Sequence, residues 1–365
     1  MTDCQSLEEI PSTFGNLQKL EWLEMDGCIN LQVVPTHFNL ASLEMVNMME
    51  CSKLRKFPDF STNTTDLTIT DTMLEELPNS IERWSRLENL NIYGSLEVFT
   101  DIEKLPDWIK SLDALNEVSI TGCPKLASLP EFPDSLKKLV VHDCESLETL
   151  ISFSSESQIR KLYFFNCFKL CREARREIAE LPSLACLPGR TVPAQFDHQA
   201  LGNSLTIRSD HKEFRVCAVV SPKQKMEEEC ELSCRIHLNG CLIVSGIVHN
   251  VYRITTKHLF ISDCNILEED GCLEQDNEIS FEFITSSEDI DVIECGVRIL
   301  TFETDESEVS YGSYESSLEE MSEDDDENLY DNEFCAEPVY EDDDENLFDG
   351  SNESDEPSVK RLKTV

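Results

Sequence analysis

The sequence has no run of about 18 or more apolar residues, the length that a membrane-spanning helix needs. Its first ten residues, MTDCQSLEEI, lack the basic and apolar segments of a secretory signal, so we expect no export. Basic residues are scarce, because 30 Lys and Arg stand against 73 Asp and Glu, a formal net charge of −43. Proteins bind nucleic acids by neutralising phosphates, so we expect no direct binding to DNA or RNA.

Sequence motifs of common enzymes are also absent. There is no GxxxxGK[ST] phosphate-binding loop and no GxSxG nucleophile elbow. Cys230, Cys234 and His237 form one string of metal-ligand types. On the strand expected there, Cys234 and His237 point to opposite faces, which argues against a shared metal ion. We therefore expect no catalytic residues, no cofactor and no metal, and the chain is not expected to be an enzyme.

A repeat dominates residues 1–170. Its pattern is apolar-x-x-apolar-x-apolar-x-x-Cys, where x is any residue and another small residue can replace the Cys. This pattern recurs seven times. The second apolar column occupies positions 23, 46, 67, 90, 118, 139 and 162, a mean step of about 23 residues. An apolar residue followed by Pro recurs with the same period, as at Val34-Pro35 and Leu129-Pro130. This period is typical of leucine-rich repeats and predicts a solenoid with one short strand per repeat.

The cysteine column is expected to be structural. Its members are a full repeat apart, whereas zinc ligands come in closely spaced pairs. Buried Cys behaves as a small apolar residue. The column consists of Cys28, Cys51, Cys123, Cys144 and Cys167. A chain of this length with 16 cysteines and no export signal does not fit a disulfide scaffold, so we expect reduced thiols and an intracellular location.

The middle residue of each expected strand and its two flanking columns face the concave side of such a solenoid. The N-terminal strands carry polar and acidic residues there, and the C-terminal strands carry aromatic residues beside lysines. Exposed aromatic residues are typical anchors of protein interfaces. The candidate protein-binding residues are Trp22, Glu24, Asn47, Asn91, Tyr93, His142, Tyr163 and Phe165. An alternative is that the next domain simply covers Tyr163 and Phe165.

The periodicity stops after Cys167. Leu170, Ala174, Ile178 and Leu181 share one face of a short helix, so residues 171–185 are expected to form a capping helix and linker. Residues 186–301 contain short strand-like runs separated by turn signals, which predict an all-β sandwich. The expected strands are 204–207, 214–220, 233–238, 259–262, 279–284 and 292–301, with longer charged loops at 223–231 and 263–277.

The last part of the chain has a composition of its own. Residues 301–358 contain 24 Asp or Glu and no Lys or Arg, and the sequence EDDDENL occurs at both 323–329 and 341–347. High charge with few apolar residues predicts a disordered acidic tail over 302–365. A solubilising tail is one interpretation. A regulatory or scaffold protein that acts through this tail is the alternative, and the short basic patch at Lys360, Arg361 and Lys363 would make it nuclear.

Several segments resemble the TIR-type nucleotide-binding leucine-rich-repeat disease resistance proteins of plants. The Cys-marked repeats and the segment Phe165-Asn166-Cys167-Phe168-Lys169-Leu170 resemble their repeats. The segment CLPGRTVPAQFDHQALGNSLTI at 186–207 resembles the start of their post-repeat jelly-roll domain, called C-JID, and FRVCAVV, HLFI and ECGVRIL fit its later strands. The expected fold is therefore an α/β leucine-rich-repeat solenoid, then an all-β jelly-roll or sandwich domain over 186–301, then a disordered acidic tail.

The resemblance implies the recognition region of an intracellular immune receptor. In that family the repeats and C-JID bind a pathogen effector protein in defence signalling, and a TIR region cleaves NAD. This sequence contains neither a phosphate-binding loop nor a TIR region, so the resemblance implies no enzyme activity for it. The implied partners are an effector and the nucleotide-binding region of a full-length receptor. The implied location is the cytoplasm, with the nucleus as a second location.

Overall fold

The computed structural model describes residues 1–35, 40–54, 63–70, 77, 79–94, 102–150, 153–226, 229–266 and 277–300. All of these residues belong to one compact unit. The acidic tail expected at 302–365 lies outside the described residues, and so do Phe57-Pro58, Thr72 and Ser95 of the repeat pattern.

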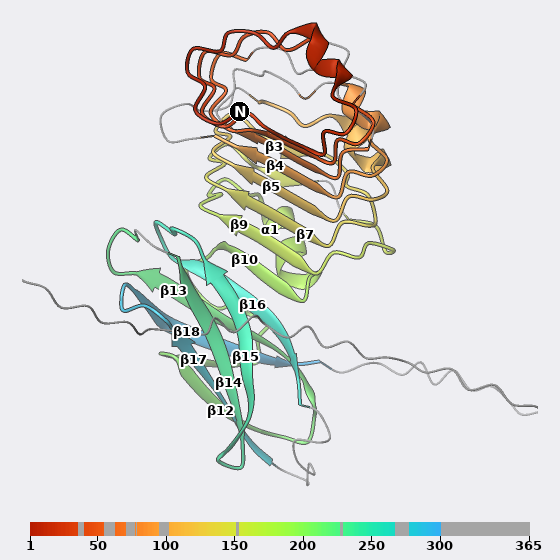
Figure 1. Ribbon diagram of the computed structural model, residues 1–365. Coiled ribbons are helices and arrows are strands. Elements are labelled where there is room, and N and C mark those ends of the chain that lie inside the picture. The colour runs from red at the N-terminus through yellow and green to blue at the C-terminus, as the bar shows by residue number, and fades with distance from the viewer. Residues whose placement is uncertain are drawn as a thin grey trace, which may run out of the picture. The chain divides into compact units, whose positions relative to one another are not determined.

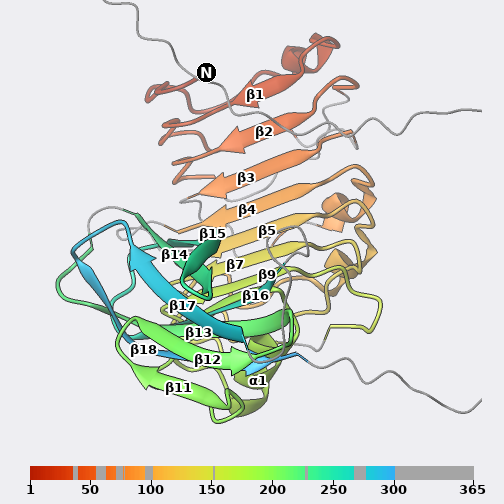
Figure 2. The ribbon, with the colours of Figure 1, turned by 90° about the horizontal axis from the view of Figure 1, so that it is seen from below.

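Seven short strands of the described chain, one from each repeat, form a parallel sheet (Figures 1 and 2). Equivalent repeat positions face each other across neighbouring strands, as Leu23 with Val46 and Leu139 with Leu162. The leucine-rich-repeat solenoid predicted from the spacing is therefore confirmed. The strands are β1 (Trp22–Glu24), β2 (Met45–Met48), β3 (Asp66–Thr70), β4 (Asn89–Tyr93), β5 (Glu117–Thr121), β7 (Lys138–His142) and β9 (Lys161–Phe165).

The opposite side of the solenoid carries 3-10 helices and short extended segments. The helices are η1 (Ser12–Asn16), η2 (Asn79–Arg83) and η3 (Asp107–Ser111), and β6 (Ser128–Leu129) pairs in parallel with β8 (Thr149–Leu150). Pro11 and Pro106 directly precede η1 and η3, each with φ of −68°. Because proline is pre-set for the start of a helical turn, the recurring Pro marker fixes where the chain enters the convex side.

The core of the solenoid consists of the inward apolar columns and the cysteine column. Cys28, Cys51, Cys123, Cys144 and Cys167 are all fully buried. Their thiols donate to backbone carbonyls, as Cys51 Sγ to Met25 O (3.3 Å) and Cys167 Sγ to Phe165 O (3.4 Å). Burial raises the pKa of both Cys51 and Cys167 to about 12, so these thiols stay protonated and act as small packing groups. Every described cysteine is a free thiol.

A left-handed backbone residue precedes each cysteine of the column. These residues are Gly27, Glu50, Gly122, Asp143 and Asn166, with φ between 53° and 68°. At Gly122 a Cβ atom would come within 2.5 Å of the Gly94 carbonyl oxygen, so only glycine fits there. The sequence analysis did not single out this column. Its Gly, Asp and Asn content was the available signal, because these residues tolerate the left-handed turn best.

Helix α1 (Arg172–Glu180) follows the last repeat and packs against its core. Ala174 and Ile178 are buried against the solenoid core, but Leu181 is 46 % exposed, so its expected place on the buried face is wrong. The helix ends at Glu180. Beyond Glu180 the helical hydrogen bonding stops. The Arg215 guanidinium instead donates hydrogen bonds to the carbonyl oxygens of Ala179, Glu180 and Pro182.

The solenoid sheet continues without a break into the second half of the chain. Strand β10 (Leu184–Pro188) pairs in parallel with β9 and antiparallel with β16 (His258–Asn265). The sheet then proceeds through β13 (Glu213–Pro222) and β18 (Ile290–Ile299) to β11 (His198–Leu201). The domain boundary expected between residues 185 and 186 falls inside β10. The two halves therefore share one backbone ladder of twelve strands.

A second sheet lies in the C-terminal half. Its order is β12 (Ser204–Ser209), β17 (Asn277–Thr285), β14 (Cys230–Leu238) and β15 (Cys241–Val251), with every pair antiparallel. Each of the six expected strand runs lies in a strand, apart from the residues after Ile299. The sequence analysis missed β10, β11 and β15. It also assigned Asp263 to a loop, although this residue lies in β16 and pairs with Arg215.

Candidate functional site

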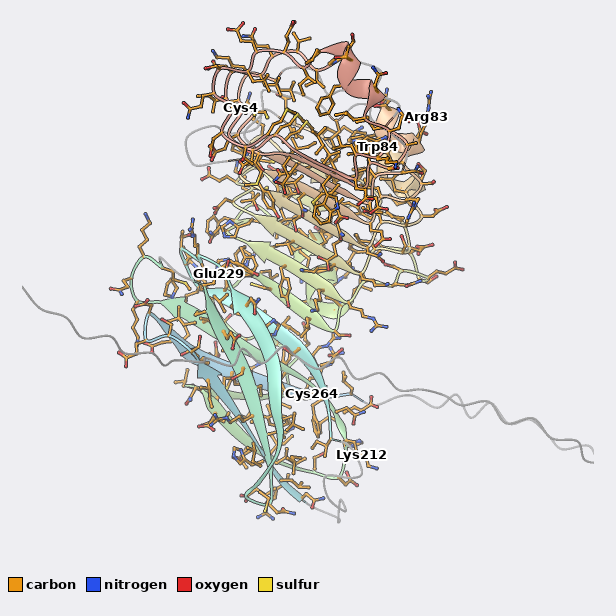
Figure 3. The ribbon with its side chains drawn as sticks, viewed as in Figure 1. Cys4, Arg83, Trp84, Lys212, Glu229 and Cys264 are labelled. Carbon is orange, nitrogen blue, oxygen red and sulfur yellow. The ribbon has the colours of Figure 1, made fainter. Side chains whose placement is uncertain are left out.

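A cleft of about 620 Å³ lies between the concave solenoid strands and the segment that follows β15. One wall comes from β4, β5, β7 and β9. The other comes from Asn250, Tyr252 and Arg253, and from Glu229, which precedes β14 at the end of that strand nearest the repeats (Figure 3). Its lining residues are Asn91, Tyr93, Glu117, Ser119, Thr121, Lys138, Val140, His142, Lys161, Tyr163, Phe165, Glu229, Asn250, Tyr252 and Arg253. Five of the eight predicted site residues are among them.

The solenoid wall is built from lateral contacts between equivalent positions of neighbouring strands. Asn91 Nδ2 donates to Thr68 Oγ1 on the neighbouring strand (3.3 Å). Lys138 Nζ on β7 forms an ion pair with Glu117 on β5 (3.1 Å). The repeat period places the members of these two pairs one strand apart, about 4.8 Å in a sheet. Within β4 itself, Tyr93 Oη donates to Asn91 Oδ1 (3.3 Å). The wall is therefore a regular polar surface whose side chains hold one another in place.

Phe165 is not a surface residue, and this corrects the expectation of an exposed aromatic anchor. Its side chain is fully buried, with ring centroids 5.8 Å from Tyr163, 5.4 Å from Tyr252 and 6.4 Å from Phe260. Tyr163 is only 8 % exposed. The physical reason is that Tyr252 and Phe260 of the second half pack over the end of the solenoid. The interpretation that the next domain covers these two residues is the one that matches the structure.

His142 lies at the inner end of the cleft and is 9 % exposed. Its Nδ1 lies 2.8 Å from the Asp143 carboxylate, but neither Nδ1 nor Nε2 makes a hydrogen bond of good geometry with a described residue. Burial raises the pKa of Asp143, but the contact with His142 and the hydrogen bond from Asn166 outweigh burial. The pKa of Asp143 is therefore lowered, and the carboxylate stays ionised beside the imidazole.

Asn166 joins the last repeat to the second half of the chain. Its backbone N–H donates to His258 Nε2 (3.0 Å), and its Nδ2 donates to Asp143 Oδ1 (2.8 Å) and to Arg253 O (3.2 Å). Its Oδ1 accepts from the backbone N–H and the hydroxyl of Thr255, at 3.0 and 3.1 Å. The amide is thus fully used, so Asn166 fixes residues 253–258 against the solenoid. The sequence analysis missed this role.

Two buried histidines stand behind the cleft. His258 accepts at Nε2 and therefore donates from Nδ1 to Thr256 O (2.9 Å), which requires a neutral ring. Burial lowers the pKa of His258 to about 4. Burial, followed by the charge of Lys161, lowers the pKa of His249 to about 3, and its Nε2 contacts the Ser262 hydroxyl. Both rings are neutral at physiological pH and belong to the interior.

Three predicted site residues lie outside the cleft, on the open concave surface of β1 and β2. Trp22 is 65 % exposed and stands in register with Met45, which is 37 % exposed. Glu24 is exposed, and Asn47 is half-buried, with its Oδ1 accepting from the Met49 backbone N–H (3.0 Å). Trp22 and Met45 form an apolar pair on an otherwise polar face, which is the kind of patch that protein partners cover.

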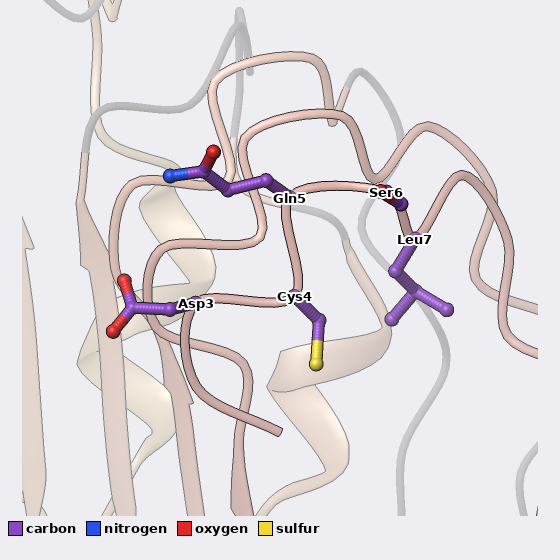
Figure 4. A pocket seen from close by; sticks show the side chains of 5 residues that line it. All are labelled: Asp3, Cys4, Gln5, Ser6 and Leu7. Carbon is purple, nitrogen blue, oxygen red and sulfur yellow. The ribbon is translucent and has the colours of Figure 1, made fainter.

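A second hollow, of about 490 Å³, lies at the N-terminal end of the solenoid. It is lined by Asp3, Cys4, Gln5, Ser6 and Leu7 (Figure 4). In the described part of the chain, no group of three or more His, Cys, Asp or Glu side chains is placed to hold a metal ion. The described helices include none that is long and apolar enough to cross a membrane. We take the cleft and the open face beside it as the candidate site.

Comparison with known proteins gives relatives over most of the chain. Disease resistance protein RML1B of Arabidopsis thaliana is 41 % identical over 352 residues, covering 88 % of this chain and 33 % of the relative. Disease resistance protein RML1A of the same species is 35 % identical, covering 85 % of this chain and 34 % of the relative. The chain thus spans about a third of the length of these relatives. No protein-family model matches it.

Among solved structures, the leucine-rich repeat domain of the type III effector XCV3220 (XopL) is 22 % identical in sequence. The match between the two covers 46 % of this chain and 67 % of the XopL chain, with a TM-score of 0.37.

Proposed function

The chain belongs to the TIR-type plant disease resistance proteins, and from this premise we propose that it is the recognition region of an intracellular immune receptor. In this proposal it binds a pathogen effector protein and performs no catalysis itself. The observation that carries the proposal is the concave face, which offers an exposed apolar pair at one end and a polar cleft at the other. Protein interfaces combine such apolar anchors with a polar surround.

The second half contributes one wall of the cleft, and we assign it to the C-JID class of jelly-roll domains. Two antiparallel layers support the assignment: β16, β13, β18 and β11 in one, and β12, β17, β14 and β15 in the other. Double-sheet jelly rolls have this organisation. The match of CLPGRTVPAQF at residues 186–196 to the start of C-JID adds to it. Tyr252 and Arg253 would then be the C-JID residues that meet the effector.

The proposal extends to partners and place. The nucleotide-binding region of a full-length receptor is the second proposed partner, since the relatives are about three times as long as this chain. The proposed location is the cytoplasm, with the nucleus as a second one.

The test is a binding assay against a panel of purified pathogen effector proteins by biolayer interferometry. An effector that binds the chain should bind Trp22→Ala and Tyr93→Ala at least about tenfold more weakly, because both side chains are on the concave face. Leu17→Ala is the matched control, since Leu17 is 47 % exposed next to η1 and away from the concave strands. Binding by no effector, or equal binding by all three variants, would contradict the proposal.

The acidic composition of residues 301–358 favours one alternative, a regulatory or scaffold protein that acts through its tail. Deleting residues 302–365 separates the two functions. A recognition region that uses the concave face keeps its effector binding after the deletion, whereas a protein that acts through the tail loses its partner.

A further inference from the structure

We propose that the inner end of the cleft is a carboxylate-binding pocket, which receives Asp or Glu side chains from an extended segment of the partner protein. This inference rests on the proposed function, because it names the chemistry of the partner at the same site. Lys161, Arg253 and His142 are the residues that would hold the acidic group. They come from β9, from the segment after β15 and from β7.

The first argument is the presence of two cleft cations without an ion pair, within an acidic protein. Of the cations in the cleft, Lys138 is already paired with Glu117. Lys161 and Arg253 are exposed, and neither forms an ion pair with a described residue, although Glu229 also lines the cleft and the charge of Arg253 helps to lower the pKa of Asp143. Lys161 stands directly beside Lys138 in register, so two ammonium groups share one part of the wall. An acidic side chain placed between these cations would form the charge-assisted contacts that they lack.

The second argument is the unsatisfied imidazole of His142. Buried polar atoms in proteins nearly always have a hydrogen-bond partner, yet neither ring nitrogen of His142 has one of good geometry among the described residues. Its Nδ1 lies 2.8 Å from the Asp143 carboxylate, whereas no carboxylate of the described residues is paired with Nε2. A carboxylate from the partner would supply the partner that Nε2 lacks, by accepting a hydrogen bond from that nitrogen.

Charged groups stand near His142. The Asp143 carboxylate lies 2.8 Å from its Nδ1, and Arg253 lines the same cleft. His258, the other ionisable ring near His142, is held neutral by its hydrogen bonds to Asn166 and Thr256. His142 is thus the ring in this corner that is placed to respond to a ligand.

The third argument concerns direction. The same columns that carry Lys138 and Lys161 on β7 and β9 carry Asp66 on β3, and Glu24 lies on β1. A carboxylate is repelled near β1 to β3 and attracted at β7 to β9. The upstream strands instead present the apolar Trp22 and Met45. A partner segment with an acidic end and an apolar end would therefore lie on the sheet in one orientation, because the reverse places like charges together.

The test uses the full chain and a fluorescein-labelled, C-terminally amidated peptide, GDYEDYG, with the identically labelled analogue GNYQNYG, which lacks the acidic side chains. Fluorescence anisotropy should show at least about tenfold tighter binding of the acidic peptide, and binding should weaken as salt is raised from 50 to 500 mM. Lys161→Ala and Arg253→Asn should each weaken it at least about tenfold. Asn is chosen at position 253 because the backbone there has φ of +29°.

Lys104→Ala is the matched control, because Lys104 is an exposed lysine that pairs with Asp107 outside the cleft. It should change the peptide affinity less than about twofold. A second readout is the imidazole itself: His142→Phe should weaken binding of the acidic peptide, because its ring has no nitrogen that can donate to a carboxylate. Circular dichroism spectra that match the unmodified chain establish that each variant is folded.

Equal affinity for the two peptides, or Lys161→Ala binding like Lys104→Ala, would overturn the inference. The outcome is separable from the fate of the proposed function. Lys161-dependent peptide binding by a chain that binds no effector leaves the pocket standing and removes the proposed function. Effector binding that Lys161→Ala leaves unchanged keeps the proposed function and removes the pocket.

Discussion

The two ends of the concave sheet have the same backbone and opposite surfaces. At β1 and β2 the strand positions that face outward hold Trp22 and Met45, both exposed, whereas at β9 they hold Tyr163 and Phe165, both buried. The repeat spacing sets the direction of each side chain in the same way at both ends. Exposure is decided instead by Tyr252, His258 and Phe260, about 90 residues further along the chain. Direction is therefore a local property, and burial is not.

The largest loss of stability is expected from a substitution at the buried end of the sheet, β9. Phe165→Ala should lower the free energy of unfolding by about 3–5 kcal/mol, because it leaves a cavity among packed aromatic rings. Tyr93→Ala, in the same column but only half-buried, should cost about 1 kcal/mol. Urea unfolding followed by circular dichroism measures both. Equal losses would mean that the cover over β9 contributes nothing to stability.

The cover is anchored by Arg215, and removing that anchor should be nearly as costly. Its guanidinium binds the Asp263 carboxylate at 2.6 and 2.8 Å and three carbonyls at the end of α1. Arg215→Met should destabilise the chain by about 3 kcal/mol, because it leaves buried oxygens without donors. Lys223→Met is the control, since the Lys223–Asp291 ion pair is exposed and should contribute less than about 1 kcal/mol. If Arg215→Met lost as little stability as Lys223→Met, Arg215 would not be the residue that holds the second half against α1.

Acid should weaken the buried end selectively. His258 stays neutral in the folded chain down to a pKa of about 4, whereas an unfolded histidine takes up its proton near pH 6.5. The unfolded state therefore binds more protons between these values. Stability is full above pH 6.5 and falls by about 1 kcal/mol per unit as pH drops toward 4. His249, with a pKa of about 3, adds to the same trend.

Urea unfolding at pH 7.5, 6.5 and 5.5 measures this slope. His258→Asn should flatten it, and His211→Gln, which replaces an exposed histidine, should leave it unchanged. A slope that is the same in both variants would show that protonation of His258 is not linked to unfolding.

The smallest effect belongs to the open end. Trp22→Ala should change the free energy of unfolding by less than about 0.5 kcal/mol, because most of the side chain is already in water. The same urea experiment measures it. A loss above about 2 kcal/mol would mean that the indole supports the fold, and Trp22 would then no longer be a candidate for recognition.

The sequence was sufficient for the features that depend on short spacing. Leu23 and Cys28 were assigned to the core from a repeat of about 23 residues, and both are buried. It was insufficient where distant segments meet. No spacing pattern relates Lys161 to Arg253, or Asn166 to His258, because these pairs come together only when β10 joins the two halves.

Strand β15 is an intermediate case. The Asn239-Gly240 pair forms the turn that leads into it, with φ of 50° and 83°, and such a pair between two apolar runs is a hairpin signal. The sequence analysis expects turn signals between the strands of this half, but it predicts no strand directly after Asn239-Gly240. The prediction for Leu181 was wrong for the opposite reason, because the helical spacing included Leu181 although the helix ends one residue earlier, at Glu180.

The parallel ladder of the repeats also bears on how such a protein can change. Each repeat strand pairs with the strand of the next repeat at equivalent positions. A whole repeat can therefore be added or removed on the β1 side without moving Lys161, His142 or Arg253. On the β9 side the ladder is closed by β10 and β16, and an insertion there would displace one cleft wall from the other. The molecule has one end that can lengthen by whole repeats and one end whose length is fixed.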